Sequence, residues 1–234
     1  MLKRVVLKLT GESLAGKQGF GVDPQALDAL AEKVISACNT GAEIAVVVGG
    51  GNFIRGSQLS GQNLIRPRTA HQMGMTSTII NGLALSEALL AKGASTSLTC
   101  VMPAGNFTEY YNPQKAQTDL HNKKVVILTG GTGNAFVTTD TCAAIRAAEL
   151  QADAVLKATK VDGVYAKDPV KYADAKKYDK LTYDQVINDR LGVMDLAAVE
   201  ICKQANIPII VFNFQTPENI DKVIKGQQVG TTIS

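Results

Sequence analysis

The feature that most constrains this chain is an apolar run that ends in three glycines, Ala45-Val46-Val47-Val48-Gly49-Gly50-Gly51. Because both faces of the run are apolar, it predicts a buried strand of a parallel sheet. The glycines have no Cβ, so an anion can approach their N–H groups at the strand's carboxyl end, where open α/β sheets bind ligands. Arg55 follows with a forked set of donors that fits phosphate oxygens. An ordinary strand-to-helix turn is the alternative interpretation.

A second glycine-rich loop follows another predicted strand. The apolar run 124–128 leads into Thr129-Gly130-Gly131-Thr132-Gly133-Asn134. Neither loop completes the Gly-x-Gly-x-x-Gly fingerprint of dinucleotide-binding folds, because Phe136 and Ile54 stand where a third glycine is needed. NAD and FAD are therefore disfavoured as ligands.

The segment 11–17 has the spacing of a P-loop up to its lysine, but it lacks the rest of that motif. Gln18 stands where a serine or threonine would hold magnesium, and Pro24 follows closely, so no helix is expected to start there. We therefore disfavour a P-loop and expect a flexible hairpin over residues 16–21.

The predicted elements alternate along the chain between strands and helices. Strands are expected at 4–11, 45–48, 95–101, 124–128, 154–157 and 209–213, with a further edge strand at 230–233. Helices are expected at 24–39, 69–92, 113–120, 140–150, 181–188, 195–204 and 217–225. Polar or charged loops are expected at 57–67, 158–165 and 172–180. This alternation predicts an α/β fold with a mostly parallel sheet and helices on both of its faces.

Composition and charge exclude several classes of protein. The 24 Lys and Arg against 21 Asp and Glu give a net charge of +3, too small to indicate nucleic acid or an anionic membrane as a partner. No apolar run could span a bilayer, and the N-terminus leads straight into a strand, so we expect a cytoplasmic protein. The four cysteines are scattered without a Cys-x-x-Cys pair, which favours buried reduced thiols over a zinc site or disulfides.

Three charged residues stand out as candidates for chemistry. Lys8 lies among aliphatic residues near a strand's carboxyl end, where an ammonium could reach a ligand at the sheet edge. Asp140 begins a predicted helix with Thr139 as its N-cap, so it either complements the helix dipole or faces the same cleft as the glycine loops. Asp195 also begins a predicted helix, and the same two roles are open for it.

Motifs along the whole chain resemble those of bacterial UMP kinases, a branch of the amino acid kinase superfamily. They are Lys8-Leu9-Thr10-Gly11, Gly49-Gly50-Gly51-Asn52, Gly131-Thr132-Gly133-Asn134, Thr138-Thr139-Asp140, Lys157-Ala158-Thr159-Lys160-Val161-Asp162-Gly163-Val164 and Val193-Met194-Asp195-Leu196-Ala197-Ala198. The resemblance implies a three-layer αβα sandwich of the amino acid kinase fold, formed by one domain over residues 1–234. It also implies a UMP-binding side at about residues 1–150 and an ATP-binding side at about 151–234.

The resemblance implies transfer of a phosphoryl group from MgATP to UMP, giving UDP and ADP. Magnesium would come with ATP, and the resemblance assigns it no particular protein ligands. The implied catalytic residues are Lys8, Arg55, Asp140 and Asp195. The implied ATP-binding residues are Lys8, Leu9, Thr10, Gly11, Gly51, Arg55, Thr159, Tyr165 and Asp168. The implied UMP-binding residues are Gly50, His71, Thr132, Gly133, Asn134, Ala135, Phe136, Val137, Thr138 and Thr139. Asp140 would orient lysines or magnesium rather than act as a strong base.

The chain departs from the family at one position that matters for UMP. His71 stands where the family usually has an aspartate that bonds the ribose, and an imidazole offers one hydrogen-bonding partner there rather than two acceptor oxygens. The resemblance further implies a homohexamer, activated by GTP and inhibited by UTP, with segment 16–21 linked to the GTP response. Two alternatives stay open: a carboxylate or carbamate kinase of the same fold, and a non-catalytic nucleotide-binding relative.

Overall fold

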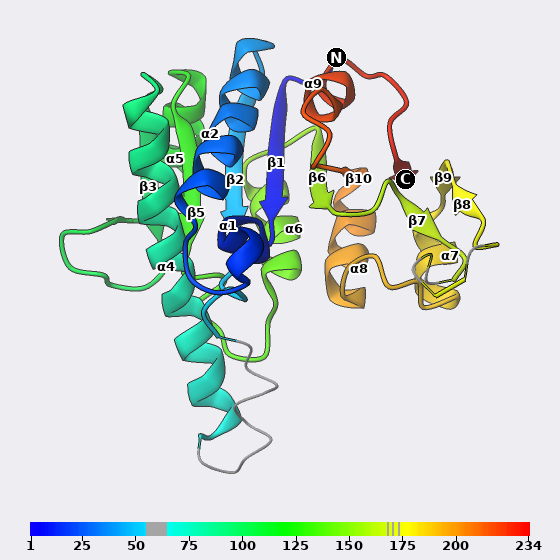
Figure 1. Cartoon of the computed structure of the whole chain (residues 1–234), viewed down its shortest axis with the longest axis horizontal. Coiled ribbons are helices and arrows are strands. Elements are labelled where there is room, and N and C mark those ends of the chain that lie inside the picture. Colours follow the sequence, from blue (N-terminus) through cyan, green and yellow to red (C-terminus); the bar gives the residue numbers. More distant parts are fainter. Residues whose placement is uncertain (55–64, 168, 170, 173) are drawn as a thin grey trace.

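The computed structural model describes residues 1–54, 65–167, 169, 171–172 and 174–234. Within these residues, nine strands form one sheet in the order β4-β3-β5-β2-β1-β6-β10-β11-β9, and β7 and β8 form a separate pair. The strands are β1 (Arg4–Leu9), β2 (Glu43–Val48), β3 (Thr96–Cys100), β4 (Glu109–Tyr110), β5 (Val125–Thr129), β6 (Ala154–Thr159), β7 (Val164–Tyr165), β8 (Lys177–Tyr178), β9 (Lys180–Leu181), β10 (Ile209–Asn213) and β11 (Thr231–Ile233). Figure 1 shows the path of the chain through these strands.

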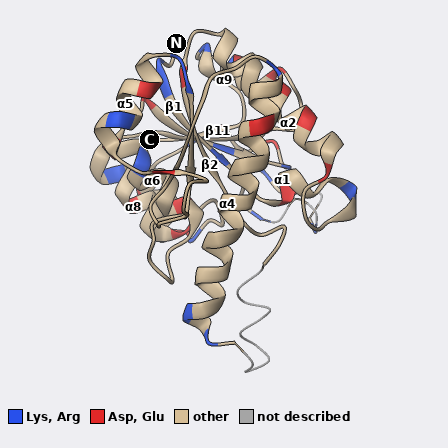
Figure 2. Cartoon of the chain, turned by 90° about the vertical axis from the view of Figure 1, so that its left-hand side faces the viewer, with Lys and Arg blue, Asp and Glu red and all other residues tan. Residues whose placement is uncertain are grey.

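The described helices pack on both faces of this sheet, which makes a three-layer αβα sandwich (Figure 2). They are α1 (Glu12–Ala15), the 3₁₀ turn η1 (Gly16–Gln18), α2 (Pro24–Asn39), α4 (Pro67–Ala91), α5 (Pro113–His121), α6 (Thr139–Glu149), α7 (Tyr183–Asn188), α8 (Leu196–Ala205) and α9 (Asn219–Ile224). One core cluster lies between the sheet and α5, α6, α7 and α8, and the other between the sheet and α1, α2, α4 and α9. The N-terminal end of α4 projects beyond these layers (Figures 1 and 2).

The centre of the sheet is parallel, as the apolar runs predict. β1 pairs in parallel with β2 on one side and β6 on the other, and all but the first residue of β1 and β2 are buried. Strands that are covered on both faces are apolar on both faces, which explains why their sequences do not alternate. Lys8 is the one charged residue at the buried positions of β1 and β2. The expected α/β class and the mostly parallel sheet are confirmed.

The prediction for residues 16–21 was wrong, because the segment after β1 is helical. α1 and η1 together cover residues 12–18, and Gly16 and Gly19 bend the chain with φ values of +56° and +72°. Leu14 is fully buried, and its carbonyl accepts a 2.7 Å hydrogen bond from the Asp23 N–H. The buried leucine therefore holds a helical turn where glycine content alone suggested a hairpin.

Two predictions near the C-terminal side of the sheet were also wrong. β11 is not the edge strand, because Thr232 pairs with Lys180 of β9, which lies outside it. Leu181 consequently belongs to β9, and α7 begins at Tyr183 rather than at Leu181. Thr182 fixes that start, since its side chain and that of Gln185 form a reciprocal capping box.

Smaller corrections concern a helix start, two loops and one cysteine. Thr138, rather than Thr139, is the N-cap of α6, since its Oγ1 accepts from the N–H groups of Asp140 and Thr141 at 3.0 and 3.2 Å. The expected loops 158–165 and 172–180 contribute the β7–β8 pair.

All four cysteines are free thiols, as expected, but Cys38 is only half-buried. The expected loop 57–67 lies largely outside the described residues.

The remaining helices lie close to their predicted positions. α2 and α5 begin where an Asp or Asn N-cap precedes a proline, and both caps accept the expected backbone hydrogen bond. α4 runs from Pro67 to Ala91, against a prediction of 69–92. Within the described residues, no helix combines the length and the apolar character that crossing a membrane would require.

Candidate active site

Two lysines occupy opposite positions on neighbouring strands at the centre of the sheet. Lys8 of β1 pairs in register with Lys157 of β6, and residues at paired positions project from the same face. Asp140, in the first turn of α6, lies against both: its Oδ1 is 2.7 Å from the Lys8 Nζ, and its Oδ2 is 2.7 Å from the Lys157 Nζ. The side chains of Lys8, Lys157 and Asp140 are only 8%, 12% and 15% exposed. One carboxylate thus bridges two ammonium groups that would otherwise repel each other, and the trio carries a net positive charge.

Burial and these ion pairs act in opposite directions on the pKa values of the trio. Burial raises the pKa of Asp140, but the Lys8 and Lys157 ammonium groups outweigh it, so the pKa lies below its ordinary value. Burial lowers the pKa of Lys157 more than the Asp140 carboxylate raises it. Asp140 is therefore a carboxylate at neutral pH, suited to holding the lysines in place rather than to accepting a proton.

Asp195 connects the two helices that flank this trio. It is the N-cap of α8, where its Oδ1 accepts from the Ala198 N–H at 2.9 Å and from the Thr141 Oγ1 at 2.7 Å. Its Oδ2 accepts from the Thr138 hydroxyl, so one carboxylate joins the N-terminal ends of α6 and α8. Lys157 also donates to the Val193 carbonyl just before α8. Asp195 therefore lies near the trio, with both of its oxygens already bonded to protein groups.

Close contacts require glycine at one position in each of the loops that follow β1 and β2. A Cβ on Gly50 would lie 2.4 Å from the Gly74 carbonyl oxygen of α4, and one on Gly11 would lie 2.4 Å from the Asn52 Oδ1. Gly51 has open space around it and is exposed. The loop after β1 and the loop after β2 therefore touch, next to the Lys8 end of the sheet.

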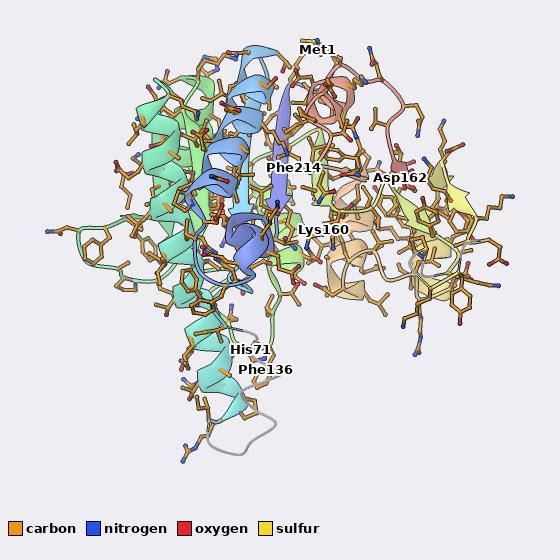
Figure 3. All side chains as sticks on the ribbon, viewed as in Figure 1. Met1, His71, Phe136, Lys160, Asp162 and Phe214 are labelled. Carbon is orange, nitrogen blue, oxygen red and sulfur yellow. The ribbon has the colours of Figure 1, made fainter. Side chains whose placement is uncertain are left out.

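The second glycine loop follows β5 and has a strained backbone. Gly130, Gly131 and Gly133 have φ values of +76°, +59° and +78°, and Phe136 is a non-glycine residue at +68°. The Phe136 side chain is 68% exposed and lies against His71 of α4, with ring centroids 4.8 Å apart and planes inclined by 54°. Figure 3 shows these two rings together beside the projecting end of α4. This tilted contact with His71 thus holds an exposed aromatic ring at the rim of the loop.

A cleft of about 530 Å³ is lined by residues of β6 and β10 and by the segments 161–167 and 189–193. Lys157, Thr159 and Tyr165 are among its lining residues. Thr159 Oγ1 interacts with the carbonyls of Val161 at 2.6 Å and Phe212 at 3.1 Å, and the Tyr165 hydroxyl donates to Asp162. Thr159 and Tyr165, two of the three residues that the sequence predicts to bind ATP in this part of the chain, therefore share one cleft with Lys157 of the trio.

The structure brings most of the predicted residues to one edge of the sheet. Lys8 and Leu9 end β1, and Thr10 and Gly11 follow it. Gly50 and Gly51 follow β2, and the residues of segment 132–139 follow β5 and lead into α6. Arg55 and Asp168 lie outside the described residues. Sequence reasoning gave Lys157 no site role, although a lysine in an apolar strand is the same signal that singled out Lys8. It also missed Thr78 and Asn81 of α4, whose polar side chains are buried.

Bare main-chain amides, two lysines and a buried acid at a sheet edge are the groups that phosphoryl transfer requires. Comparison with known proteins gives the class, because residues 3–213 match the model of the amino acid kinase family. The chain belongs to this family and, within it, to the uridylate kinases, a group of phosphotransferases. It is 46% identical to the uridylate kinase of a Psychrobacter species over 98% of this chain and 95% of that protein. It is 44% identical to the uridylate kinase of Acinetobacter baumannii over 99% of this chain and 96% of that protein.

Solved structures agree with the sequence relatives. The crystal structure of UMP kinase from Bacillus anthracis superposes with a TM-score of 0.96 at 36% identity, covering 100% of this chain and 96% of that one. The UMP kinase structure from Ureaplasma parvum gives a TM-score of 0.92 at 32% identity, covering 100% and 99%. The amino acid kinase fold expected from the sequence motifs is thereby confirmed.

Proposed function

We propose that this chain transfers the γ-phosphoryl group of MgATP to UMP, forming UDP and ADP. An oxygen of the UMP phosphate attacks the γ-phosphorus, and the bond from that phosphorus to the β–γ bridging oxygen breaks as ADP leaves. The attacking oxygen is already anionic, so no strong base is needed. The observation that carries the proposal is the Lys8–Asp140–Lys157 trio, which lies on the strands β1 and β6 beside the two strands that lead into the glycine loops, in a chain that belongs to the uridylate kinases.

Each part of the site has a distinct task in this reaction. The Lys8 and Lys157 ammonium groups offset the negative charge that spreads over the transferred group, and Asp140 fixes their positions. The amides of the first glycine loop hold phosphate oxygens, and Arg55 assists them. The second loop, residues 132–139, together with His71, holds UMP. Thr159, Tyr165 and Asp168 hold the adenosine half of ATP. Asp195 supports the start of α6 and so acts on Asp140 indirectly.

Magnesium fits this site as a partner of the nucleotide. Both oxygens of Asp195 accept hydrogen bonds, whereas the buried Asp140 Oδ1 has an ion pair with Lys8 but no hydrogen bond, so Asp140 is the carboxylate of the two with an oxygen left for a metal. Among the residues that the structure describes, no group of three or more His, Cys, Asp or Glu side chains could hold a metal ion. The ATP phosphates would therefore supply most ligands, and bound magnesium would neutralise part of the triphosphate charge.

Regulation and assembly follow the family in this proposal. We expect a cytoplasmic homohexamer that GTP activates and UTP inhibits. Exposed apolar side chains support assembly, since Phe20 and Ile80 are 64% and 47% exposed and line one groove beside α4. A group of exposed apolar side chains of this kind is typical of a contact between protein chains. Light scattering of the purified protein tests the hexamer, and initial rates with added GTP or UTP test the regulation.

An acceptor screen tests the proposed reaction. Purified protein with MgATP is given UMP, CMP or dUMP, and ADP formation is followed by a coupled assay. We expect turnover with UMP and much less with the other two. Turnover with glutamate, acetylglutamate, aspartate or carbamate instead would indicate a carboxylate or carbamate kinase. ATP binding without turnover on any of these acceptors would indicate a non-catalytic relative.

A further inference from the structure

α4 passes close to both glycine loops, and two of its buried side chains bond to them. Thr78 is 1% exposed and Asn81 is fully buried. At a spacing of three residues they lie on the same side of the helix. Gly50 belongs to the first loop and lies against Gly74 of the same helix. Gly130 belongs to the second loop, and its N–H donates to the Thr78 Oγ1 at 2.8 Å.

The hydroxyl of Thr78 is fully engaged in this contact. Its proton goes to the Met75 carbonyl within α4 at 2.6 Å, which leaves the oxygen to accept from the Gly130 N–H. Gly130 is itself buried, so its N–H depends on a protein partner. The start of the second loop is therefore held at a fixed distance from α4.

Asn81 makes the corresponding contacts with the first loop. Its Nδ2 donates to the Gly49 carbonyl at 2.7 Å and to the Asn52 Oδ1 at 2.7 Å, while its Oδ1 accepts from the Asn52 Nδ2 at 2.9 Å. Asn52 also donates to the Gly21 carbonyl at 2.7 Å and accepts at its own carbonyl from the Gly21 N–H at 3.0 Å. Asn81 therefore anchors the loop at both of its ends, and Asn52 ties segment 16–21 to it.

We propose that Thr78 and Asn81 are positioning residues that set the distance between the two glycine loops, and hence between the two phosphate groups that react. This inference rests on the proposed function, in which the first loop holds phosphates and the second holds UMP. Neither side chain needs to touch a nucleotide. In-line transfer depends on the distance between the donor and acceptor phosphates. A small shift of one loop should therefore lower kcat more than it weakens nucleotide binding.

The substitution Thr78→Val tests the proposal, because valine has nearly the same shape and removes only the hydroxyl, with its bonds to the Met75 carbonyl and the Gly130 N–H. We expect kcat to fall by about 10- to 100-fold with little change in the KM for either nucleotide. Thr78→Ser restores the hydroxyl and should recover most of the rate. Thr76→Val is the matched control: Thr76 bonds to a carbonyl of the same helix, that of Gln72 at 3.0 Å, but it is exposed. It should leave kcat unchanged.

A second variant and a second readout separate positioning from a general loss of structure. Asn81→Asp removes both donated hydrogen bonds and should lower kcat in the same way. Hydrogen exchange followed by mass spectrometry should show faster exchange in residues 49–52 for Asn81→Asp and in residues 130–134 for Thr78→Val, with the strands unchanged. If Asn81→Asp does not fold, the Thr78 series decides alone.

Three results would overturn the proposal. In the first, Thr78→Val behaves like Thr76→Val. In the second, its loss of rate equals its loss of folded protein by circular dichroism. In the third, the change appears only in KM. A parent chain that is inactive on UMP would instead overturn the proposed function, and hydrogen exchange of the loops would still test whether Thr78 and Asn81 hold them.

Discussion

The Lys8 Nζ lies 2.7 Å from the Asp140 Oδ1, although the two residues come from a strand near the N-terminus and a helix near the middle of the chain. The contact is buried on both sides, with side-chain exposures of 8% and 15%. A buried charge that loses its partner is strongly destabilised, so each residue fixes the other. The pair therefore orients the ammonium group in advance of substrate binding, which avoids reorganisation during the reaction.

Removing either member of this pair should abolish most of the activity. We expect Lys8→Met and Asp140→Asn each to lower kcat by about 10²- to 10³-fold, because the first removes a charge that offsets the transferred group and the second frees both lysines to move. Steady-state ADP release measures the effect. Lys92→Met, which removes a lysine paired with Asp28 away from the trio, is the control and should retain its rate. An Asp140→Asn enzyme of nearly parental kcat would contradict this role.

The pH dependence of the rate should show which changes come from ionisable groups of the protein and which come from the phosphate of the substrate. Because the pKa of Asp140 is lowered, this group stays ionised from neutral pH down to below about 4 and contributes no acid limb. The fall on the acid side should instead come near pH 6, where a phosphate monoester takes up its second proton. On the alkaline side, the lowered pKa of Lys157 predicts a decline that begins earlier than for an ordinary lysine.

A profile of kcat/KM between pH 5 and pH 10, the range over which these groups change charge, checks this expectation. The residual activity of Asp140→Asn should show the same acid limb as the parent. If the limb vanished in that variant, Asp140 rather than the acceptor phosphate would be the titrating group.

Asp195 should matter for stability first and for rate second. Asp195→Ala removes the N-cap of α8 and the link to Thr138 and Thr141, so we expect the free energy of unfolding to fall by about 1–2 kcal/mol. Asparagine is also a good N-cap, so Asp195→Asn should lose less stability. Urea denaturation measures the difference. A loss of kcat in Asp195→Asn as large as that of Asp140→Asn would indicate a direct catalytic role instead.

His71 should influence which acceptor the enzyme prefers. It lies against Phe136 beside the second glycine loop, where we propose that UMP binds. We expect His71→Asp to tighten UMP binding and to increase the preference for UMP over dUMP, because a carboxylate accepts hydrogen bonds from ribose hydroxyls through two oxygens. Calorimetric titration with UMP and the acceptor screen check both effects. An unchanged UMP affinity would count against any ribose contact at position 71.

Acid stability should depend on a second buried carboxylate, far from the trio. Burial raises the pKa of Asp119, but hydrogen bonds from Lys115, Lys124 and Ser97 outweigh it and lower the pKa to about 2. The unfolded chain binds this proton near pH 3.8, so the stabilisation is complete above that pH and is lost as the pH falls toward 2.

The substitution Asp119→Asn should therefore lower the melting temperature at pH 7 and should do so less at pH 2.5, within the window between these two pKa values. Thermal melts of the parent and the variant at both pH values measure this. An equal decrease in melting temperature at the two pH values would show that the ionised form of Asp119 does not stabilise the fold.

Local sequence was enough to locate most elements, because their signals are short-range. The Asp23-Pro24 and Asn112-Pro113 pairs mark helix starts that the structure reproduces. Sequence-based prediction was wrong where a contact between residues far apart in the chain determined the local structure. Leu14 converts a glycine-rich segment into helical turns by entering the core, and β9 displaces β11 from the edge by pairing with Thr232.

In the candidate site, too, some residues could be identified from the sequence and others only from the tertiary structure. The sequence alone singled out Lys8, the two glycine loops and Asp140, because a charge in an apolar strand and glycines at strand ends are visible without coordinates. Only the tertiary structure decided that Lys8 and Lys157 are neighbours in register, that Asp140 bridges them, and that Thr78 and Asn81 hold both loops. Periodicity and turn chemistry act over a few residues, whereas these contacts depend on how strands pair and helices pack across the whole chain.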